Sequence, residues 1–180
     1  EAVHNPRSAP PRNLDAFPYA DFRPLQPDPR WRGKKMVLPV QTSRGCPFDC
    51  TFCSVTGMFG KAYRFRSTEH ILGELRLHAD RNRNLFFYDD NFAAHKPRTR
   101  ELLEAMIREG FKFRWTTQVR ADVARDPELV GLMKRSGCHT VYIGFETVNP
   151  DALQDMNKKQ TVAEIAHAVK VFRRNRIHIH

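Results

Sequence analysis

The sequence predicts an α/β fold, because short apolar, β-branched segments alternate along the chain with segments of helical periodicity. Five segments have strand character: residues 36–42, 85–88, 113–117, 140–145 and 177–180. Strand–helix–strand connections of this length imply right-handed crossovers and parallel strands, as in an α/β barrel or a doubly wound sheet. We expect the barrel or sheet to continue past His180, because an incomplete barrel has unpaired strand edges.

Residues suited to helix starts lie between these strands. They are Ser67, Pro97, Asp126 with Pro127, Asn149 with Pro150, and the capping-box pair Thr161 and Glu164. Side-chain oxygens of Ser, Thr, Asp and Asn accept the free amides of a first helical turn, and proline fits that turn. Gly110 and Gly137 mark two helix ends. The longest connection, from Ser43 to about Arg66, follows the first strand, where a parallel fold places its functional loops.

Residues 1–33 are predicted to be a proline-rich extended linker, and residues 34–180 the core domain. Seven of the 12 prolines lie in the first 30 positions, where they disfavour helices and central strands. Apolar residues could fix the linker to a neighbouring surface: Leu14, Phe17, Tyr19, Phe22 and Trp31. A partly disordered tail is the alternative.

Composition excludes several classes of protein. A chain of 180 residues with 41% hydrophobic residues has enough apolar material for a core, despite its net charge of +10. No apolar run is long enough to span a membrane, and no signal peptide follows Glu1, so we expect a cytoplasmic protein. Four cysteines are too few for a disulfide scaffold.

Three of the cysteines, Cys46, Cys50 and Cys53, form a C-x3-C-x2-C pattern in the long connection. Thiolates at such spacing suit zinc, copper(I) or iron–sulfur clusters. Cys138 is expected at the far end of its own strand, as a small buried residue. Three cysteines without a fourth favour a cluster with one open iron. The alternatives are simple packing or a zinc site completed by a histidine such as His95.

The loop resembles the C-x3-C-x-aromatic-C motif of radical S-adenosylmethionine enzymes, with Phe52 as the aromatic residue. The resemblance covers residues 34–180 and implies a partial (β/α)6 TIM-like barrel, of which this chain holds four to five strands and lacks the C-terminal part. It implies a 4Fe-4S cluster held by Cys46, Cys50 and Cys53. It also implies S-adenosylmethionine on the open iron, cleaved by one electron to methionine and a 5′-deoxyadenosyl radical. That electron comes from a reductant such as flavodoxin or ferredoxin.

Such a cofactor needs carboxylates and hydrogen-bonding side chains at neighbouring strand ends. The resemblance assigns the methionine amine to Asp89 or Asp90, which stand where the family often has Gly-Gly-Glu, and the ribose hydroxyls to Glu146. Gln118 and Arg120 follow the third strand, where a guanidinium could pair with the methionine carboxylate. The alternatives are a helix-capping role for the aspartates, a surface salt bridge for Arg120 and an ordinary loop acid at position 146.

Further segments resemble the branch of the family that carries an upstream cobalamin-binding domain. They are residues 42–46, 54–60, 63–67 and 89–92, and, in the linker, 11–15 with 17–18. The sequence has no Asp-x-His-x-x-Gly motif for a cobalt-ligating histidine. The resemblance implies cobalamin-dependent methyl transfer or rearrangement on a small molecule or biosynthetic intermediate.

Two alternative functions follow from charge and from the cysteines. Basic residues are concentrated in one region and could contact RNA, as in tRNA-modifying methylthiotransferases: Arg64, Arg66, Arg76, Arg81 and Arg83. The extra cysteines and the RNA-binding module of those enzymes are not found here, and a solvated basic face is the simpler interpretation. A non-catalytic module that binds zinc or RNA is the alternative from another class.

Overall fold

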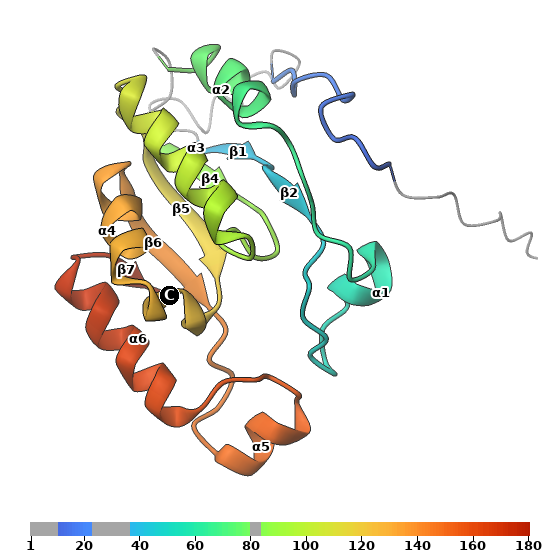
Figure 1. Cartoon of the computed structure of the whole chain (residues 1–180), viewed down its shortest axis with the longest axis vertical. Helices are drawn as coiled ribbons and strands as arrows, with labels where there is room; N and C mark the ends of the chain where they lie inside the picture. The colour runs from blue at the N-terminus through green and yellow to red at the C-terminus, as the bar shows by residue number, and fades with distance from the viewer. Residues whose placement is uncertain (1–10, 23–36, 80–83) are drawn as a thin grey trace, which may run out of the picture.

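The computed structural model describes residues 11–22, 37–79 and 84–180, and within these it is an α/β structure built on a five-stranded parallel sheet (Figure 1). The strand order is β1-β4-β5-β6-β7. The strands are β1 (Val37–Val40), β4 (Asn84–Phe87), β5 (Arg114–Val119), β6 (Cys138–Ile143) and β7 (His178–Ile179). Every adjacent pair is parallel, which confirms the predicted fold class.

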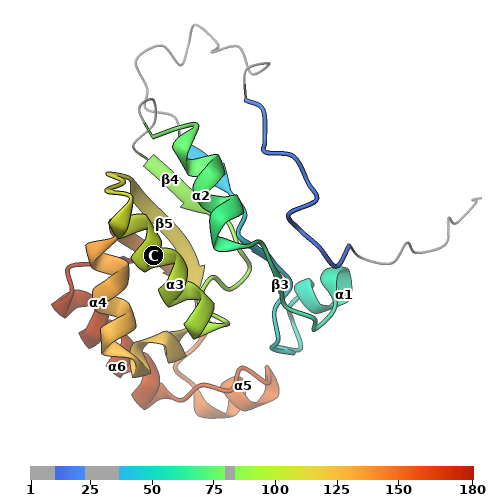
Figure 2. The ribbon, with the colours of Figure 1, turned by 45° about the horizontal axis from the view of Figure 1, so that its top comes forward.

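Helices cover one face of this sheet, as two views of the ribbon show (Figures 1 and 2). They are α2 (Thr68–Arg76), α3 (Lys96–Arg108), α4 (Pro127–Arg135) and α6 (Val162–Arg174), with a 3-10 turn at Ala121–Arg125 and the short α5 (Pro150–Asp155). The predicted caps are confirmed. Ser67 accepts a hydrogen bond from the His70 amide at 3.1 Å, and Thr161 and Glu164 form the capping box.

The long connection after β1 contains more regular structure than the sequence predicts. β2 (Ser43–Arg44) pairs antiparallel with β3 (Arg64–Phe65), and the five-residue α1 (Val55–Phe59) lies between them. Val55, Met58 and Phe59 have helical spacing, but a segment of five residues that contains Gly57 is too short for periodicity alone to predict a helix.

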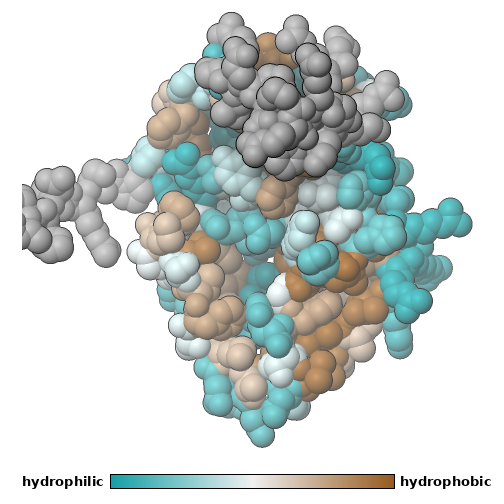
Figure 3. All heavy atoms as spheres, turned by 180° about the vertical axis from the view of Figure 1, so that it is seen from behind, coloured by the Kyte–Doolittle hydropathy of each residue, from teal (hydrophilic) through white to brown (hydrophobic). Residues whose placement is uncertain are grey.

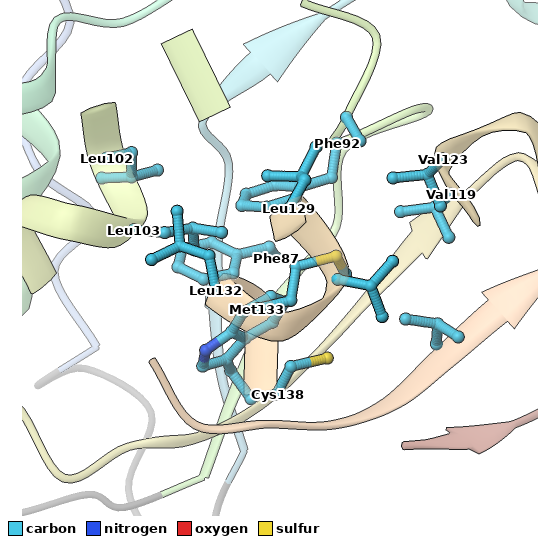
Figure 4. Close-up of a cluster of buried hydrophobic side chains, with 14 of the residues drawn as sticks. Phe87, Phe92, Leu102, Leu103, Val119, Val123, Leu129, Leu132, Met133 and Cys138 are labelled. Carbon is cyan, nitrogen blue, oxygen red and sulfur yellow. The ribbon is translucent and has the colours of Figure 1, made fainter. Parts of the chain in front are cut away.

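The core lies between the sheet and the helices. The ring of Trp115 packs against those of Phe87 and Phe92, with centroids 5.4 and 5.5 Å apart, and its indole N–H donates to the Ser136 carbonyl at 2.9 Å. Cys138 is 1% exposed and lies among these apolar side chains at the start of β6 (Figure 4). Its expected role as a buried packing residue is confirmed.

The described part of the linker contains no helix or strand and packs on α2. Leu14 is buried, the carboxylate of Asp15 accepts the Ser67 amide at 2.9 Å, and Tyr19 packs on the His70 ring at 4.7 Å. Phe22 also packs on the core. Trp31 and the remainder of the linker, together with Met36 of the first predicted strand, fall outside the described residues.

The other face of the sheet is less covered. Tyr88, just past β4, and Tyr142 of β6 are 41% and 39% exposed. From behind the view of Figure 1, hydrophobic residues gather in patches between hydrophilic ones (Figure 3). In the described part of the chain, no helix has both the length and the apolar character needed to cross a bilayer.

Candidate functional site

A cleft of about 360 Å³ lies at the carboxyl ends of β5 and β6, beside the cysteine loop. Parallel α/β folds place their functional residues at this end of the sheet. The cleft brings together all but one of the predicted site residues: Cys46, Cys50, Phe52, Cys53, Asp90, Gln118, Arg120 and Glu146.

The three cysteines of the loop are free thiols at the edge of the cleft. Cys46 and Cys50 are partly buried and Cys53 is exposed. Burial raises the pKa of Cys46, although the Phe48 amide, Asn91 and Arg120 act in the opposite direction. A guanidinium nitrogen of Arg120 lies 3.5 Å from the Cys50 sulfur. A cation beside a thiol favours the thiolate form, which is the form that binds metal.

The histidine considered as a zinc ligand lies elsewhere. Through Nδ1, His95 accepts the Arg98 amide at 3.3 Å and so caps α3, and its ring stacks on Phe65 at 5.5 Å. His95 does not line the cleft. Within the described ranges, no three His, Cys, Asp or Glu side chains are arranged to hold a single metal ion.

Of the two aspartates after β4, only Asp90 lines the cleft. Asp89 is fully buried and accepts hydrogen bonds from the Ser43 hydroxyl at 2.6 Å, the Thr42 amide at 2.9 Å and the Ser43 amide. Successive side chains in extended backbone point to opposite sides, so the two carboxylates cannot both face the cleft. The expectation that Asp89 reaches the cofactor side is therefore corrected: it anchors the start of the cysteine loop. Burial raises the pKa of Asp90, and the hydrogen bond from the Gly45 amide lowers it by less.

Arg120 is held in the wall of the cleft. Its guanidinium stacks over Phe48 at 3.9 Å, donates to the Lys158 carbonyl and lies 3.8 Å from Asp122. The Arg120 side chain is only 10% exposed, so its ion pair with Asp122 lies in the wall of the cleft and is not a fully solvated surface pair. The Nε atom is buried and has no hydrogen-bond partner among the described residues, and the carboxylate 3.8 Å from it is that of Asp122. Gln118 donates to the Asp89 carbonyl at 3.5 Å.

Glu146 is paired with a lysine that the sequence did not reveal. The backbone of Glu146 has φ 62°, a left-handed conformation that is uncommon outside glycine and is found at strained functional positions. Its carboxylate accepts a 2.8 Å hydrogen bond from Lys158, whose side chain is 9% exposed and lies 5.2 Å from the Phe52 ring centroid. A lysine in a polar loop has no local pattern that would distinguish it from a solvated one.

The basic residues that suggested RNA binding have internal partners. Arg66 pairs with the buried Glu74 at 2.5 Å, and Arg76 pairs with Glu69 at 2.6 Å and Glu109 at 2.8 Å. Arg64 donates to two backbone carbonyls. Arg81 and Arg83 fall outside the described residues. The three described arginines of this group thus have acidic or carbonyl partners within the chain.

The donor set of the cleft fits a cluster together with S-adenosylmethionine. Three thiols offer soft ligands to iron, the carboxylates of Asp90 and Glu146 suit an amine and ribose hydroxyls, and the guanidinium of Arg120 suits a carboxylate.

Comparisons with known proteins agree with this chemistry. The family model described as "Radical SAM superfamily" matches residues 40–180. Bacteriochlorophyllide d C-12(1)-methyltransferase of Chlorobaculum tepidum is 34% identical over 142 residues, which are 77% of this chain and 31% of that protein. Hopanoid C-2 methylase of Rhodopseudomonas palustris is 30% identical and aligns with 69% of this chain and 25% of its own length. The chain thus spans about a third or less of the length of each of these two relatives.

Solved structures share the fold. The radical S-adenosylmethionine methyltransferase TsrM from Kitasatospora setae, solved with cobalamin and a 4Fe-4S cluster, has a TM-score of 0.73 at 18% identity, over 81% of this chain and 30% of TsrM. The cobalamin-dependent enzyme OxsB has a TM-score of 0.69 at 19% identity, over 79% of this chain and 23% of OxsB. By its sequence match over most of its length, this chain belongs to the radical SAM superfamily, whose enzymes use a 4Fe-4S cluster and S-adenosylmethionine.

Proposed function

We propose that this chain forms the cluster- and S-adenosylmethionine-binding part of a cobalamin-dependent radical SAM methyltransferase. The single observation that supports this most is the cleft in which Cys46, Cys50 and Cys53 face the polar ends of β5 and β6. Methyltransferase and methylase relatives favour methyl transfer over rearrangement as the outcome. The substrate is a small molecule or biosynthetic intermediate.

In this proposal the three thiolates hold a 4Fe-4S cluster with one open iron, which supplies the electron that cleaves a carbon–sulfur bond of S-adenosylmethionine. Asp90 accepts the methionine amine, and Glu146, held by Lys158, accepts the ribose hydroxyls. The Arg120 guanidinium would pair with the methionine carboxylate, and Phe52 would lie beside the bound cofactor. Gln118 holds the Asp89 backbone beside Asp90.

Two partners complete the proposed function. A one-electron donor such as flavodoxin or ferredoxin reduces the cluster, and cobalamin, bound by an upstream domain of a longer protein, carries the methyl group. Two of the similar solved enzymes are described as cobalamin-bound, which supports the second partner. We expect a cytoplasmic protein, and a small molecule in preference to a nucleic acid as its substrate.

Anaerobic reconstitution with iron and sulfide tests the proposal. We expect a brown protein with about four irons per chain. With dithionite and S-adenosylmethionine added, liquid chromatography and mass spectrometry should detect methionine together with a product derived from the cofactor. A colourless protein that binds one zinc and no iron would contradict the proposal and support the non-catalytic alternative. Salt-dependent RNA binding by the brown protein would favour the methylthiotransferase-like alternative.

A further inference from the structure

A five-residue turn from a distant part of the chain lies against the cysteine loop. It spans residues 155–159, beginning at the last residue of α5, and we call it the clasp. The Thr51 amide donates to the Met156 carbonyl at 3.1 Å, and the Thr51 hydroxyl donates to the Asp155 carbonyl at 3.3 Å. These hydrogen bonds reach the residue that follows Cys50.

The residue that precedes Cys50 is bound by the same turn. The side-chain amide of Asn157 donates to the Asp49 carboxylate at 2.9 Å and to the Asp49 carbonyl at 3.2 Å. Lys159 lies 3.2 Å from the same carboxylate. Asp49 and Thr51 are the two sequence neighbours of Cys50, and the clasp forms hydrogen bonds with both of them.

The clasp has an unusual backbone. Asn157 and Lys159 have φ values of 48° and 53°, and among the described non-glycine residues only Glu146 and Arg176 share this conformation. Such conformations persist where the surrounding structure imposes them and are concentrated at functional sites. Three of the four lie at the cleft or in the turn that closes on the cysteine loop.

The clasp also reaches the cofactor side of the cleft. Lys158, between the two strained residues, pairs with Glu146 and lies beside Phe52, and its carbonyl accepts from Arg120. One short turn thus contacts the cysteine loop through Asn157 and the proposed ribose-binding residue through Lys158.

We infer that residues 155–159 set the position of Cys50 relative to the end of β6, with Asn157 as the main positioning residue. This inference rests on the proposed function for its consequence, which is retention of the cluster. The contact itself is independent of any cofactor. The hydrogen bonds from Asn157 keep the cysteine loop closed, and without them the loop opens more often and releases iron faster.

The substitution Asn157→Gly tests this with little risk of misfolding, because glycine adopts φ 48° readily and only the side-chain donor is lost. Arg176→Gly is the matched control, since it places glycine at φ 53° in the turn before β7, away from the cleft. Asn157→Asp is a second variant of the same shape, in which a carboxylate faces that of Asp49.

The first measurement is hydrogen exchange in the cofactor-free chain. We expect the Thr51 amide to exchange faster in Asn157→Gly, on the order of fivefold, as expected for loss of a supporting hydrogen bond. Arg176→Gly should match the unchanged chain at Thr51, and Asn157→Asp should exchange at least as fast as Asn157→Gly. Equal protection of Thr51 in all four proteins would overturn the inference whatever the chain binds.

The second measurement is the rate at which reconstituted protein loses iron to an excess of bipyridine. We expect faster loss from Asn157→Gly and Asn157→Asp, with Arg176→Gly like the unchanged chain. If the unchanged chain holds iron and all three variants release it at the same rate as the unchanged chain, the clasp does not affect retention of the cluster. The proposed function still stands in that case. If the unchanged chain takes up no iron, the proposed function fails, and the exchange experiment alone decides the clasp.

Discussion

The carboxylate of Asp89 accepts a 2.6 Å hydrogen bond from the Ser43 hydroxyl, across 46 positions of sequence. Thr42, which also donates to Asp89, accepts in turn from Arg98 of α3 at 2.9 Å. The entrance to the cysteine loop is therefore fixed by a buried polar network that joins the start of β2, the segment after β4, and α3. This network gives Asp89 a structural role distinct from that of its neighbour Asp90.

Replacement of Asp89 by alanine should destabilise the fold strongly. The Ser43 and Thr42 donors would be left buried without their acceptor, and the charge of Arg98 would lose a nearby carboxylate. We expect the free energy of unfolding to fall by roughly 3 kcal/mol, measured by urea denaturation. Asp90→Ala is the control, and we expect it to cost under about 1 kcal/mol, because among the described residues the Asp90 carboxylate accepts only the Gly45 amide, at 3.2 Å. Similar losses in the two variants would contradict the separation of roles.

Cys50 and Cys138 should differ in their effect on iron binding. Cys50→Ala should abolish cluster retention and cleavage of S-adenosylmethionine. Cys138→Ala should leave both intact and lower stability by about 1 kcal/mol, because Cys138 is a buried packing residue. Iron per chain after reconstitution and thermal unfolding measure the two effects. Loss of iron in both variants would show that Cys138 acts at the cluster.

Lys158→Met should weaken the binding of S-adenosylmethionine without removing the cluster. Methionine keeps the apolar stem beside Phe52, but the Glu146 carboxylate loses its 2.8 Å partner and its fixed orientation. We expect the Kd to rise about tenfold, or 1.4 kcal/mol, by equilibrium dialysis of the reconstituted protein. Lys170→Met is the control, because Lys170 is exposed on α6 and does not line the cleft. An unchanged Kd in Lys158→Met would argue against a role of Glu146 at the ribose.

Asp126 should contribute a stability that depends on pH. Burial acts to raise its pKa, but hydrogen bonds from the Leu129 amide and from Arg100 outweigh burial, and the pKa is lowered in the folded chain. A lowered pKa stabilises the fold above the unfolded value of about 3.9, and this contribution is lost as the pH falls through the folded value. The difference in unfolding free energy between the unchanged chain and Asp126→Asn should be constant from pH 5 to 7 and shrink below about pH 4. A difference that does not vary with pH would contradict this.

Gly137→Ala should be far more damaging than Gly110→Ala. Gly137 has φ 107°, and an added Cβ would lie 2.1 Å from the Phe113 carbonyl oxygen, whereas a Cβ at Gly110, with φ 71°, meets open space. We expect losses of about 3 kcal/mol and about 1 kcal/mol, by urea denaturation. Equal losses would show that backbone conformation, and not the close approach to β5, sets the cost at Gly137.

Much of the fold could be predicted because its determinants are local. The caps at Ser67, Asp126 and Thr161 act on amides within three residues, and the structure places each at a helix start. The cysteine spacing is equally local, and the resemblance built on it is confirmed by the family match.

The parts of the site that could not be predicted depend on contacts between distant segments. The choice between Asp89 and Asp90 follows from where β4 ends and from the amides of the first loop, 46 and 47 positions away. Asn157 meets Asp49 across 108 positions. No periodicity or motif encodes such pairs, because their partners become neighbours only after the sheet has formed.

The two attachments of the cysteine loop are made late along the chain, by Asp89 after β4 and by the clasp after β6. During synthesis the cysteines leave the ribosome long before either attachment exists. Assembly factors that deliver iron and sulfide would therefore meet a cysteine loop without the clasp contact. This lasts until the 108 positions between Asp49 and Asn157 have been synthesised. Premature metal capture, by zinc for example, is the hazard of this order of events.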